Sequence, residues 1–92
     1  MLDRRIDDTT DPEWTQIDCG QYHTVGLTKK GEVFTWGKNW YGQLGHGDEE
    51  SRTVPTKVAS LDGFVIIQVS CGHNHTAALT DKGEIFTWYV QS

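Results

Sequence analysis

The chain contains two copies of one pattern, CGQYHTVGLTKKGEVFTW at residues 19–36 and CGHNHTAALTDKGEIFTW at residues 71–88. A shift of 52 residues superimposes the copies, and 13 of the 23 positions from 14 to 36 are then identical. Such an internal period is typical of solenoids, propellers and arrays, in which each repeat is one supersecondary unit. The sequence therefore predicts a repeat architecture within a chain of 92 residues.

Each copy has the composition of short strands. His23–Thr28 and Val33–Trp36 are rich in β-branched and aromatic residues, and Gly31 between them supplies the positive φ that a tight hairpin loop requires. Gly83 occupies the same position in the second copy. No stretch of ten or more residues carries an apolar stripe of helical period, so we expect essentially no helix. The expected strands are Trp14–Cys19, Tyr22–Thr28, Val33–Trp36, Val54–Val58, Phe64–Ser70, His75–Thr80 and Ile85–Tyr89.

The strands and their spacing indicate an all-β fold of antiparallel β-propeller blades. Pro55 cannot donate to a strand ladder, so its strand is expected at the outer edge of a sheet. Four strands in about 50 residues, with such an edge strand, are typical of one blade. The period divides the chain into a first repeat at 14–65, a partial second repeat at 66–88 and a tail at 89–92 outside the pattern. Residues 1–13 are an acidic leader, or the outer strand of a preceding blade.

The segment between the copies, Gly37–Asp48, is rich in glycine and asparagine and is expected to be a structured turn region. We expect Leu44 and Trp40 to fix it to the core. The spacing Gly42-x-x-Gly45-x-Gly47 superficially matches a phosphate-binding loop, but the strand, helix and βαβ context of such a loop is missing. These glycines are therefore interpreted as turn residues.

Composition and charge exclude several classes of function. The net charge is −5 and basic residues are scattered, whereas binding to a phosphate backbone requires a concentrated positive surface, so no nucleic-acid binding by this chain alone is expected. No apolar run reaches the ~18 residues of a transmembrane helix, and the first residues lack the apolar core of a signal peptide. We expect a cytoplasmic or nuclear protein with no membrane partner, in which Cys19 and Cys71 stay reduced.

The motifs Cys-Gly-x-x-His-Thr, Asp-Lys-Gly-Glu, Phe-x-Trp, Gly-x-Asn and Gly-Gln-Leu-Gly-x-Gly closely resemble the regulator of chromosome condensation repeat over residues 14–88. The resemblance implies a seven-bladed β-propeller that serves as an interaction platform, of which this chain holds about one and a half repeats. The chain departs from the plant ultraviolet-B receptor branch, because Gly20-Gln21-Tyr22-His23 stands where that branch has Gly-Trp-Arg-His. Ultraviolet sensing is therefore not implied.

The repeated Cys and His residues allow two interpretations, a zinc site or structural residues of the blade. Cys19 with His23, and Cys71 with His75, have spacings that could serve zinc, but equivalent positions of successive blades should not converge on one ion. A small buried Cys and a His that bonds backbone within its own blade explain both copies, so no metal, cofactor or enzymatic activity is expected. The structural repeat motif comprises Cys19, Gly20, His23, Thr24, Leu27, Gly31, Trp36, Cys71, Gly72, His75, Thr76, Leu79, Gly83 and Trp88.

The leading hypothesis for function is a non-enzymatic protein–protein interaction module that presents loops to a protein partner, either a small GTPase or a basic protein surface. The expected partner-contact loop holds Trp40, Tyr41, His46, Asp48, Glu49, Glu50 and Arg52. Two alternatives stay open. The first, implied by the resemblance, is guanine-nucleotide exchange toward a Ran-like small GTPase as part of a longer chain. The second is a structural role, in which open strand edges recruit strands and the fragment self-associates.

Overall fold

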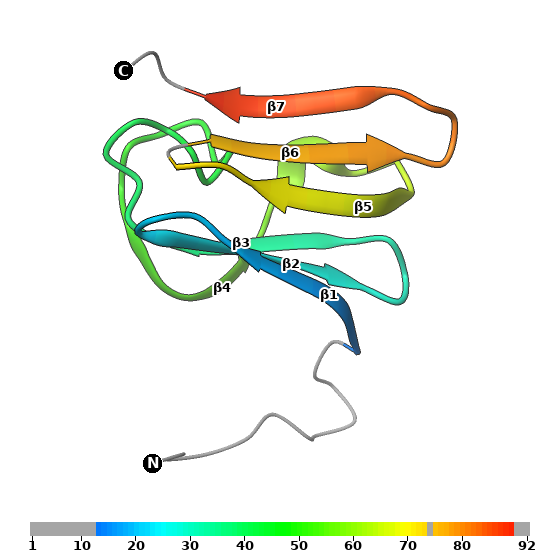
Figure 1. Ribbon diagram of the computed structural model, residues 1–92, viewed down its shortest axis with the longest axis horizontal. Coiled ribbons are helices and arrows are strands. Elements are labelled where there is room, and N and C mark those ends of the chain that lie inside the picture. The colour runs from blue at the N-terminus through cyan, green and yellow to red at the C-terminus, as the bar shows by residue number, and fades with distance from the viewer. Residues whose placement is uncertain (1–12, 74, 90–92) are drawn as a thin grey trace.

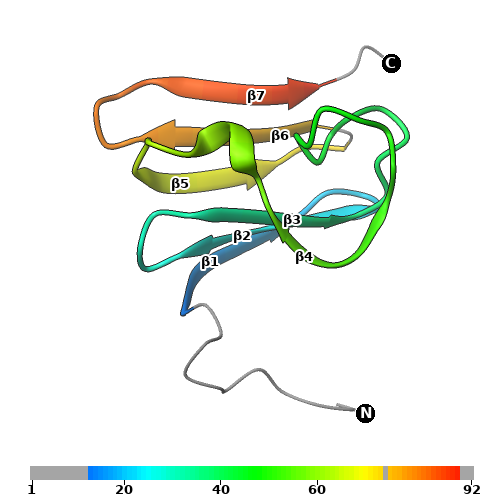
Figure 2. The same ribbon diagram turned by 180° about the vertical axis from the view of Figure 1, so that it is seen from behind.

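The computed structural model describes residues 13–73 and 75–89, which form two stacked antiparallel sheets (Figure 1). Sheet A has the strand order β1-β2-β3-β4 and sheet B has the order β5-β6-β7. Figure 2 shows the segment after β4 crossing from the outer edge of sheet A to sheet B. The elements are β1 (Trp14–Cys19), β2 (His23–Thr28), β3 (Val33–Gly37), β4 (Arg52–Lys57), the 3₁₀ turn η1 (Ala59–Leu61), β5 (Ile66–Cys71), β6 (His75–Thr80) and β7 (Ile85–Tyr89).

The sequence prediction of seven antiparallel strands is confirmed, with ends that differ by at most two residues. The only helical element among the described residues is the three-residue turn η1. The strand with Pro55, β4, lies at the edge of sheet A as expected. The described residues contain no helix long and apolar enough to cross a membrane. The leader 1–13, except Glu13, and the tail after Tyr89 lie outside the described residues.

The repeated hairpins explain why threonine and glycine recur in both copies. Gly31 and Gly83 have φ of 82° and 85°, which confirms the expected positive φ. The Thr28 hydroxyl accepts hydrogen bonds from the backbone N–H groups of Lys30 and Glu32, at 3.3 and 3.1 Å. Thr80 makes the equivalent pair of bonds at 3.2 and 3.0 Å. Each hairpin is therefore closed by a threonine side chain as well as by its glycine.

Neither sheet buries a face by itself, because the core lies between the two sheets. Both sheets and the connection through η1 contribute apolar side chains to it. A small sheet needs a covered hydrophobic face to be stable in water, so the two sheets stabilise one another. The core residues are Val25, Leu27, Val33, Val58, Leu61, Ile66, Val69 and Ala78.

The long loop between β3 and β4 packs over one end of this core. Leu44 is fully buried, as expected, and the chain beside it turns sharply at Gly45, where φ is 81°. A Cβ atom added to Gly45 would lie 2.6 Å from Nε1 of Trp88. The loop of sheet A therefore packs closely on the last strand of sheet B, and only glycine fits at this contact.

We predict that Gly45→Ala lowers the free energy of unfolding by about 2–4 kcal/mol, combining a left-handed backbone with overpacking against Trp88. Gly47→Ala is the matched control. Gly47 has nearly the same φ, 80°, but no atom within 4 Å of its added Cβ, so about 1–2 kcal/mol is expected. Urea denaturation of both variants measures the difference, and equal costs would contradict the close contact with Trp88.

Candidate functional site

Polar side chains of sheet A hold the backbone of sheet B, and they do so at a constant sequence separation. Gln16 Oε1 accepts a hydrogen bond from the Val69 N–H at 2.6 Å. Asp18 Oδ2 accepts one from the Cys71 N–H at 2.8 Å. Each bond joins residues 53 apart, one more than the repeat period. The repeat motif therefore encodes the seam between the sheets, which we define as the whole contact between sheet A and sheet B: these bonds, that of His23 and the shared core.

His23 makes the central contact of this seam. The residue is 2% exposed, and its Nε2 lies 3.0 Å from the Thr76 hydroxyl. That hydroxyl lies 2.7 Å from the Gln43 carbonyl oxygen and must donate to it. The hydroxyl oxygen can then only accept from His23, so the proton of the neutral ring lies on Nε2. This corrects the expectation that the histidine bonds backbone within its own blade, because Thr76 and the carbonyl of His75, at 3.3 Å, belong to sheet B.

The electrostatics of the buried ring favour its neutral form. Burial lowers the pKa of His23 below 6.5 by removing solvent from the charged form. The nearby His75 ring lowers the pKa further, whereas the His75 carbonyl and the Asp18 carboxylate raise it. Within the described part of the chain, Nδ1 of His23 has no hydrogen-bond partner. A second proton would therefore be placed on a buried atom without an acceptor.

The cysteines of the motif differ from the expectation that both are small buried residues. Cys19 is exposed and Cys71 is half-buried, and both are free thiols. Burial, and then the charge of Asp18, raise the pKa of the Cys71 thiol to about 12. The cause of the difference is the neighbouring sheet: Cys71 Sγ lies 3.7 Å from the Asp18 carbonyl oxygen of sheet A, whereas Cys19 Sγ lies 3.7 Å from the Thr24 hydroxyl of its own sheet. Over 13–73 and 75–89, no group of three His, Cys, Asp or Glu residues is placed to hold a metal ion.

The remaining residues of the structural repeat motif differ in how far they are buried, and two of its glycines pack against histidine rings. The ring of His23 packs against Gly20, and the ring of His75 packs against Gly72, so a Cβ at either glycine would collide with imidazole. Buried motif residues are His23, Leu27, Gly31 and Thr76. Half-buried ones are Gly20, Thr24, Trp36, Cys71, Gly72, Leu79 and Trp88, while Cys19, His75 and Gly83 are exposed.

The partner-contact loop is organised by Asn39, which the sequence analysis did not single out. This side chain is fully buried, and its Nδ2 donates to the carbonyls of Asp48 and Glu50 at 2.9 and 3.0 Å. Its Oδ1 accepts from the Leu44 N–H at 3.0 Å. Three separate parts of the loop are thus tied to one amide. The available signal was the Gly-x-Asn motif itself, since asparagine bonds readily to nearby backbone.

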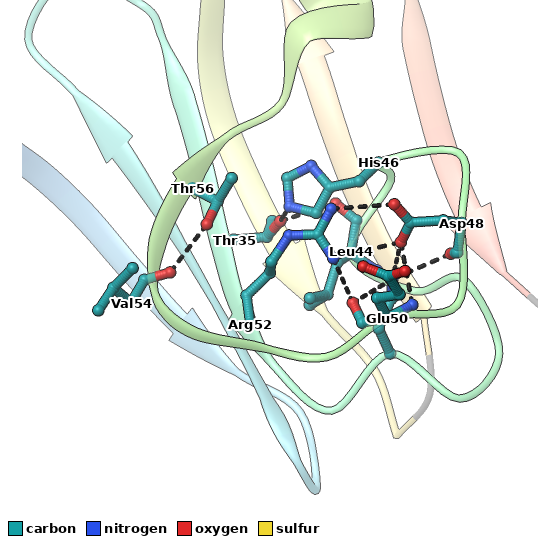
Figure 3. Close-up of polar contacts among 9 residues, drawn as sticks. Thr35, Leu44, His46, Asp48, Glu50, Arg52, Val54 and Thr56 are labelled. Atoms are coloured by element: carbon teal, nitrogen blue, oxygen red, sulfur yellow. Dashed lines mark hydrogen bonds and ion pairs between the residues drawn. The ribbon is translucent and has the colours of Figure 1, made fainter.

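Charged residues close the same loop from the β4 side (Figure 3). Arg52 Nη2 lies 3.0 Å from Asp48 Oδ2, and Arg52 Nη1 also donates to the Glu50 carbonyl. This guanidinium lowers the pKa of Asp48, and the carboxylate raises the pKa of Arg52. His46 Nε2 lies 3.0 Å from the Thr35 hydroxyl, and burial followed by the charge of Arg52 lowers its pKa. Of the expected contact residues, His46, Asp48 and Arg52 therefore hold the loop together.

Aromatic side chains beside this loop remain exposed. Tyr22, Trp40 and Tyr41 have exposed fractions of 51%, 53% and 41%. The prediction that Trp40 fixes the loop to the core is wrong, because the Trp40 side chain is exposed, and the buried Leu44 and Asn39 fix the loop instead. Instead, Trp40 packs edge-to-face on Tyr22, with ring centroids 5.8 Å apart. Lys38 Nζ lies 5.2 Å from the centroid of the Trp40 ring. We call Tyr22, Trp40 and Tyr41 the aromatic surface.

The seam predicts a pH dependence of stability. The pKa of His23 is lower in the folded chain than the value of about 6.5 in the unfolded chain. Its contribution to stability is therefore complete above pH 6.5 and is lost as the pH falls through the folded value. We expect the melting temperature to fall between about pH 7 and pH 5. His23→Gln should reduce that slope, leaving the part due to His46. His73→Gln, at an exposed ring, is the control, and an unchanged slope in His23→Gln would contradict the assignment.

The Asn39 contacts predict a second effect on stability. Asn39→Ala leaves the buried Leu44 N–H without its acceptor and should cost about 2–4 kcal/mol. Ser51→Ala, which removes only the hydroxyl that accepts from the Asn39 N–H at 3.1 Å, should cost under about 1 kcal/mol. Urea denaturation measures both variants, and hydrogen exchange at Leu44 reports the loop directly. An Asn39→Ala variant with wild-type exchange at Leu44 would show that the amide does not organise the loop.

Comparison with known sequences identifies the repeat. The sequence signature of the regulator of chromosome condensation (RCC1) repeat matches residues 30–79, and a second signature of the same repeat matches residues 14–43. The ultraviolet-B receptor UVR8 of Arabidopsis thaliana is 45% identical over 73 residues, which cover 79% of this chain and 17% of the receptor.

Solved structures agree with the sequence comparison. Human WBSCR16 superimposes with a TM-score of 0.82 at 37% identity, over 92% of this chain and 21% of that one. Prp20p of Saccharomyces cerevisiae, described together with its binding to Gsp1p and histones, superimposes with a TM-score of 0.70 at 29% identity, over 82% of this chain and 18% of that one. The chain thus spans about a fifth or less of these proteins. Its two sheets have the fold of two adjacent propeller blades.

Proposed function

Because this chain belongs to the RCC1 repeat family, whose β-propellers mediate protein interactions, we propose that its aromatic surface and the neighbouring acidic loop bind a basic segment of a protein partner. The observation that supports this proposal is the position of three exposed aromatic residues outside the seam, Tyr22, Trp40 and Tyr41. The proposal requires no catalytic group and no cofactor.

The aromatic surface is not required by the blade. Tyr22 corresponds to Asn74 in the second copy, whereas the next two residues, His23 and Thr24, recur as His75 and Thr76. Tryptophan and tyrosine are enriched among the residues that dominate binding energy, because they combine a large apolar area with a polar group. Asn39 and Leu44 hold the loop without help from these rings, so the rings are available to a partner at little cost in stability.

Charge indicates the chemistry of the partner. Asp48 is paired with Arg52, but Glu49 and Glu50 are exposed and have no ion-pair partner in the described part of the chain. The Glu50 carbonyl is bonded to Asn39, which directly precedes Trp40, so the backbone of the acidic segment lies close to that of Trp40. Lys38 near the Trp40 ring shows that this ring accepts a cation. Carboxylates next to aromatic faces suit arginine and lysine side chains.

Purified core histones are a suitable basic probe, since Prp20p is described with histone binding. Trp40→Ala should weaken their binding about 10- to 30-fold, the equivalent of losing ~1.4–2 kcal/mol at a residue that dominates an interface. Glu49→Lys combined with Glu50→Lys should weaken it at least as much at low salt, because like charges then face the probe. Fluorescence anisotropy at about 50–100 mM salt measures both effects, since screening grows above this range.

The matched control reverses charge at the opposite end of the strands. Asp81 and Glu84 are exposed in the β6–β7 hairpin, far along the sheets from the long loop (Figure 1). Asp81→Lys combined with Glu84→Lys makes the same change in net charge and should leave histone binding within about twofold, because exposed distant charges are screened. Equal weakening by both double variants would mean that only net charge matters, and wild-type affinity of Trp40→Ala would exclude the aromatic surface.

A second candidate is guanine-nucleotide exchange toward a Ran-like small GTPase as part of a longer chain. The similarity to Prp20p, which is described with its binding to Gsp1p, favours it. Exchange requires a rigid surface that displaces the nucleotide, and the chain spans 18% of Prp20p. Faster release of a fluorescent GDP analogue from a Ran-type GTPase in the presence of this chain would support exchange. An unchanged release rate would count against exchange and would not affect the proposal of protein binding.

A further inference from the structure

The two sheets each leave one apolar face uncovered by the residues that the structure describes. Equivalent positions of the repeat make this visible. Val33 in the seam is 1% exposed, whereas its equivalent Ile85 is 69% exposed. Val69 in the seam is 4% exposed, whereas its equivalent Ile17 is 53% exposed. The same position is therefore buried where a second sheet covers it and open where none does.

These open faces are the two halves of the existing seam. We call the open face of sheet B the trailing face and the open face of sheet A the leading face. The trailing face holds Ala77, Leu79 and Ile85, the equivalents of core residues Val25, Leu27 and Val33. The leading face holds Trp14, Ile17, Phe34 and Trp36, the equivalents of Ile66, Val69, Phe86 and Trp88, which lie in the core or pack against it.

The leading face is already shaped as an apolar platform. Trp14 lies across Gly26, where an added Cβ would come within 2.5 Å of its ring. The same ring packs on Phe34 and Trp36, with centroid distances of 5.4 and 5.9 Å. Three aromatic rings thus form one continuous surface beside the exposed Ile17.

A polar contact of the seam is also available on the trailing face. Gln68 is the equivalent of Gln16, whose Oε1 accepts from the Val69 N–H inside the chain. Gln68 is exposed, and no hydrogen bond of its side chain is present among the described residues. The group that matches Val69 on the leading face is the N–H of Ile17. The seam's second acceptor, Asp18, is replaced by Ser70, so the equivalent contact between molecules is weaker than the one within the chain.

We propose that the trailing face of one copy of this chain binds the leading face of a second copy, so that copies associate head to tail in the geometry of the internal seam. The occupant is specified by the seam itself, in which the equivalent apolar residues and the equivalent glutamine already contact a sheet of the same sequence pattern. The contact joins two different faces. Repetition closes a ring if the rotation per copy allows it and otherwise gives an open chain of copies. Association through these faces is independent of the aromatic surface and of its basic partner.

Light scattering on the full chain tests the proposal. The mass should rise from 10.4 kDa toward two or more times that value over about 10–500 µM, the range of a weak contact. Ile17→Lys and Ile85→Lys each place a charge on one face and should each remain at 10.4 kDa. Both positions are exposed, and circular dichroism verifies that the variants keep their strands. Ser60→Lys, an exposed change in η1 outside both faces, should assemble as the wild type does.

Mixing the two single variants distinguishes head-to-tail binding from other modes. The Ile17→Lys copy keeps an intact trailing face and the Ile85→Lys copy keeps an intact leading face, so the mixture should form a complex of twice 10.4 kDa that grows no further. A wild-type chain that stays monomeric at every concentration would overturn the proposal. So would a mixture that stays monomeric while the wild type assembles, or a Ser60→Lys variant that fails to assemble.

Discussion

One chain of hydrogen bonds at the centre of the seam organises the contact between the two blades: the His23 ring to the Thr76 hydroxyl, and that hydroxyl to the Gln43 carbonyl. These three residues come from β2, from β6 and from the loop after β3. A buried hydroxyl has one proton, so the direction of each bond is determined. Because Gln43 adjoins Leu44, the same contact fixes the loop that carries Trp40 and Tyr41. The geometry available to a partner is therefore set by the seam.

A repeat whose sheets share their core explains the exposure of individual residues. Sheet A supplies the side-chain acceptors and sheet B supplies the backbone donors, and the separation of 53 residues is constant for the bonds of Gln16 and Asp18. A residue such as Ile17 or Ile85 is apolar because its position is a core position of the repeat. Such a residue is exposed here because no described sheet covers its face, so the residue type alone does not decide its exposure.

Much of the fold could be predicted from the sequence, because strand composition, Gly31 and Gly83, and the edge position of Pro55 are local features. The arrangement of the site could not. The repeat shows that His23 matters, but a pattern of equivalent residues does not reveal whether the ring bonds within its blade or across to the next. The sequence predicts that Trp40 fixes the loop to the core, whereas the buried amide of Asn39 does so by bonding three parts of the loop. The sequence of one repeat does not show whether a second sheet covers its cysteine. Sheet A partly covers Cys71, and Cys19 is exposed.

The proton position on His23 tests this account most directly. A long-range ¹H–¹⁵N correlation spectrum of the folded chain at neutral pH separates the two ring tautomers and the charged form. The account predicts a neutral ring with its proton on Nε2, directed at the Thr76 hydroxyl, and a bare Nδ1. A proton on Nδ1, or a charged ring, would reverse or break the chain of hydrogen bonds and contradict the seam as the interaction that organises both blades.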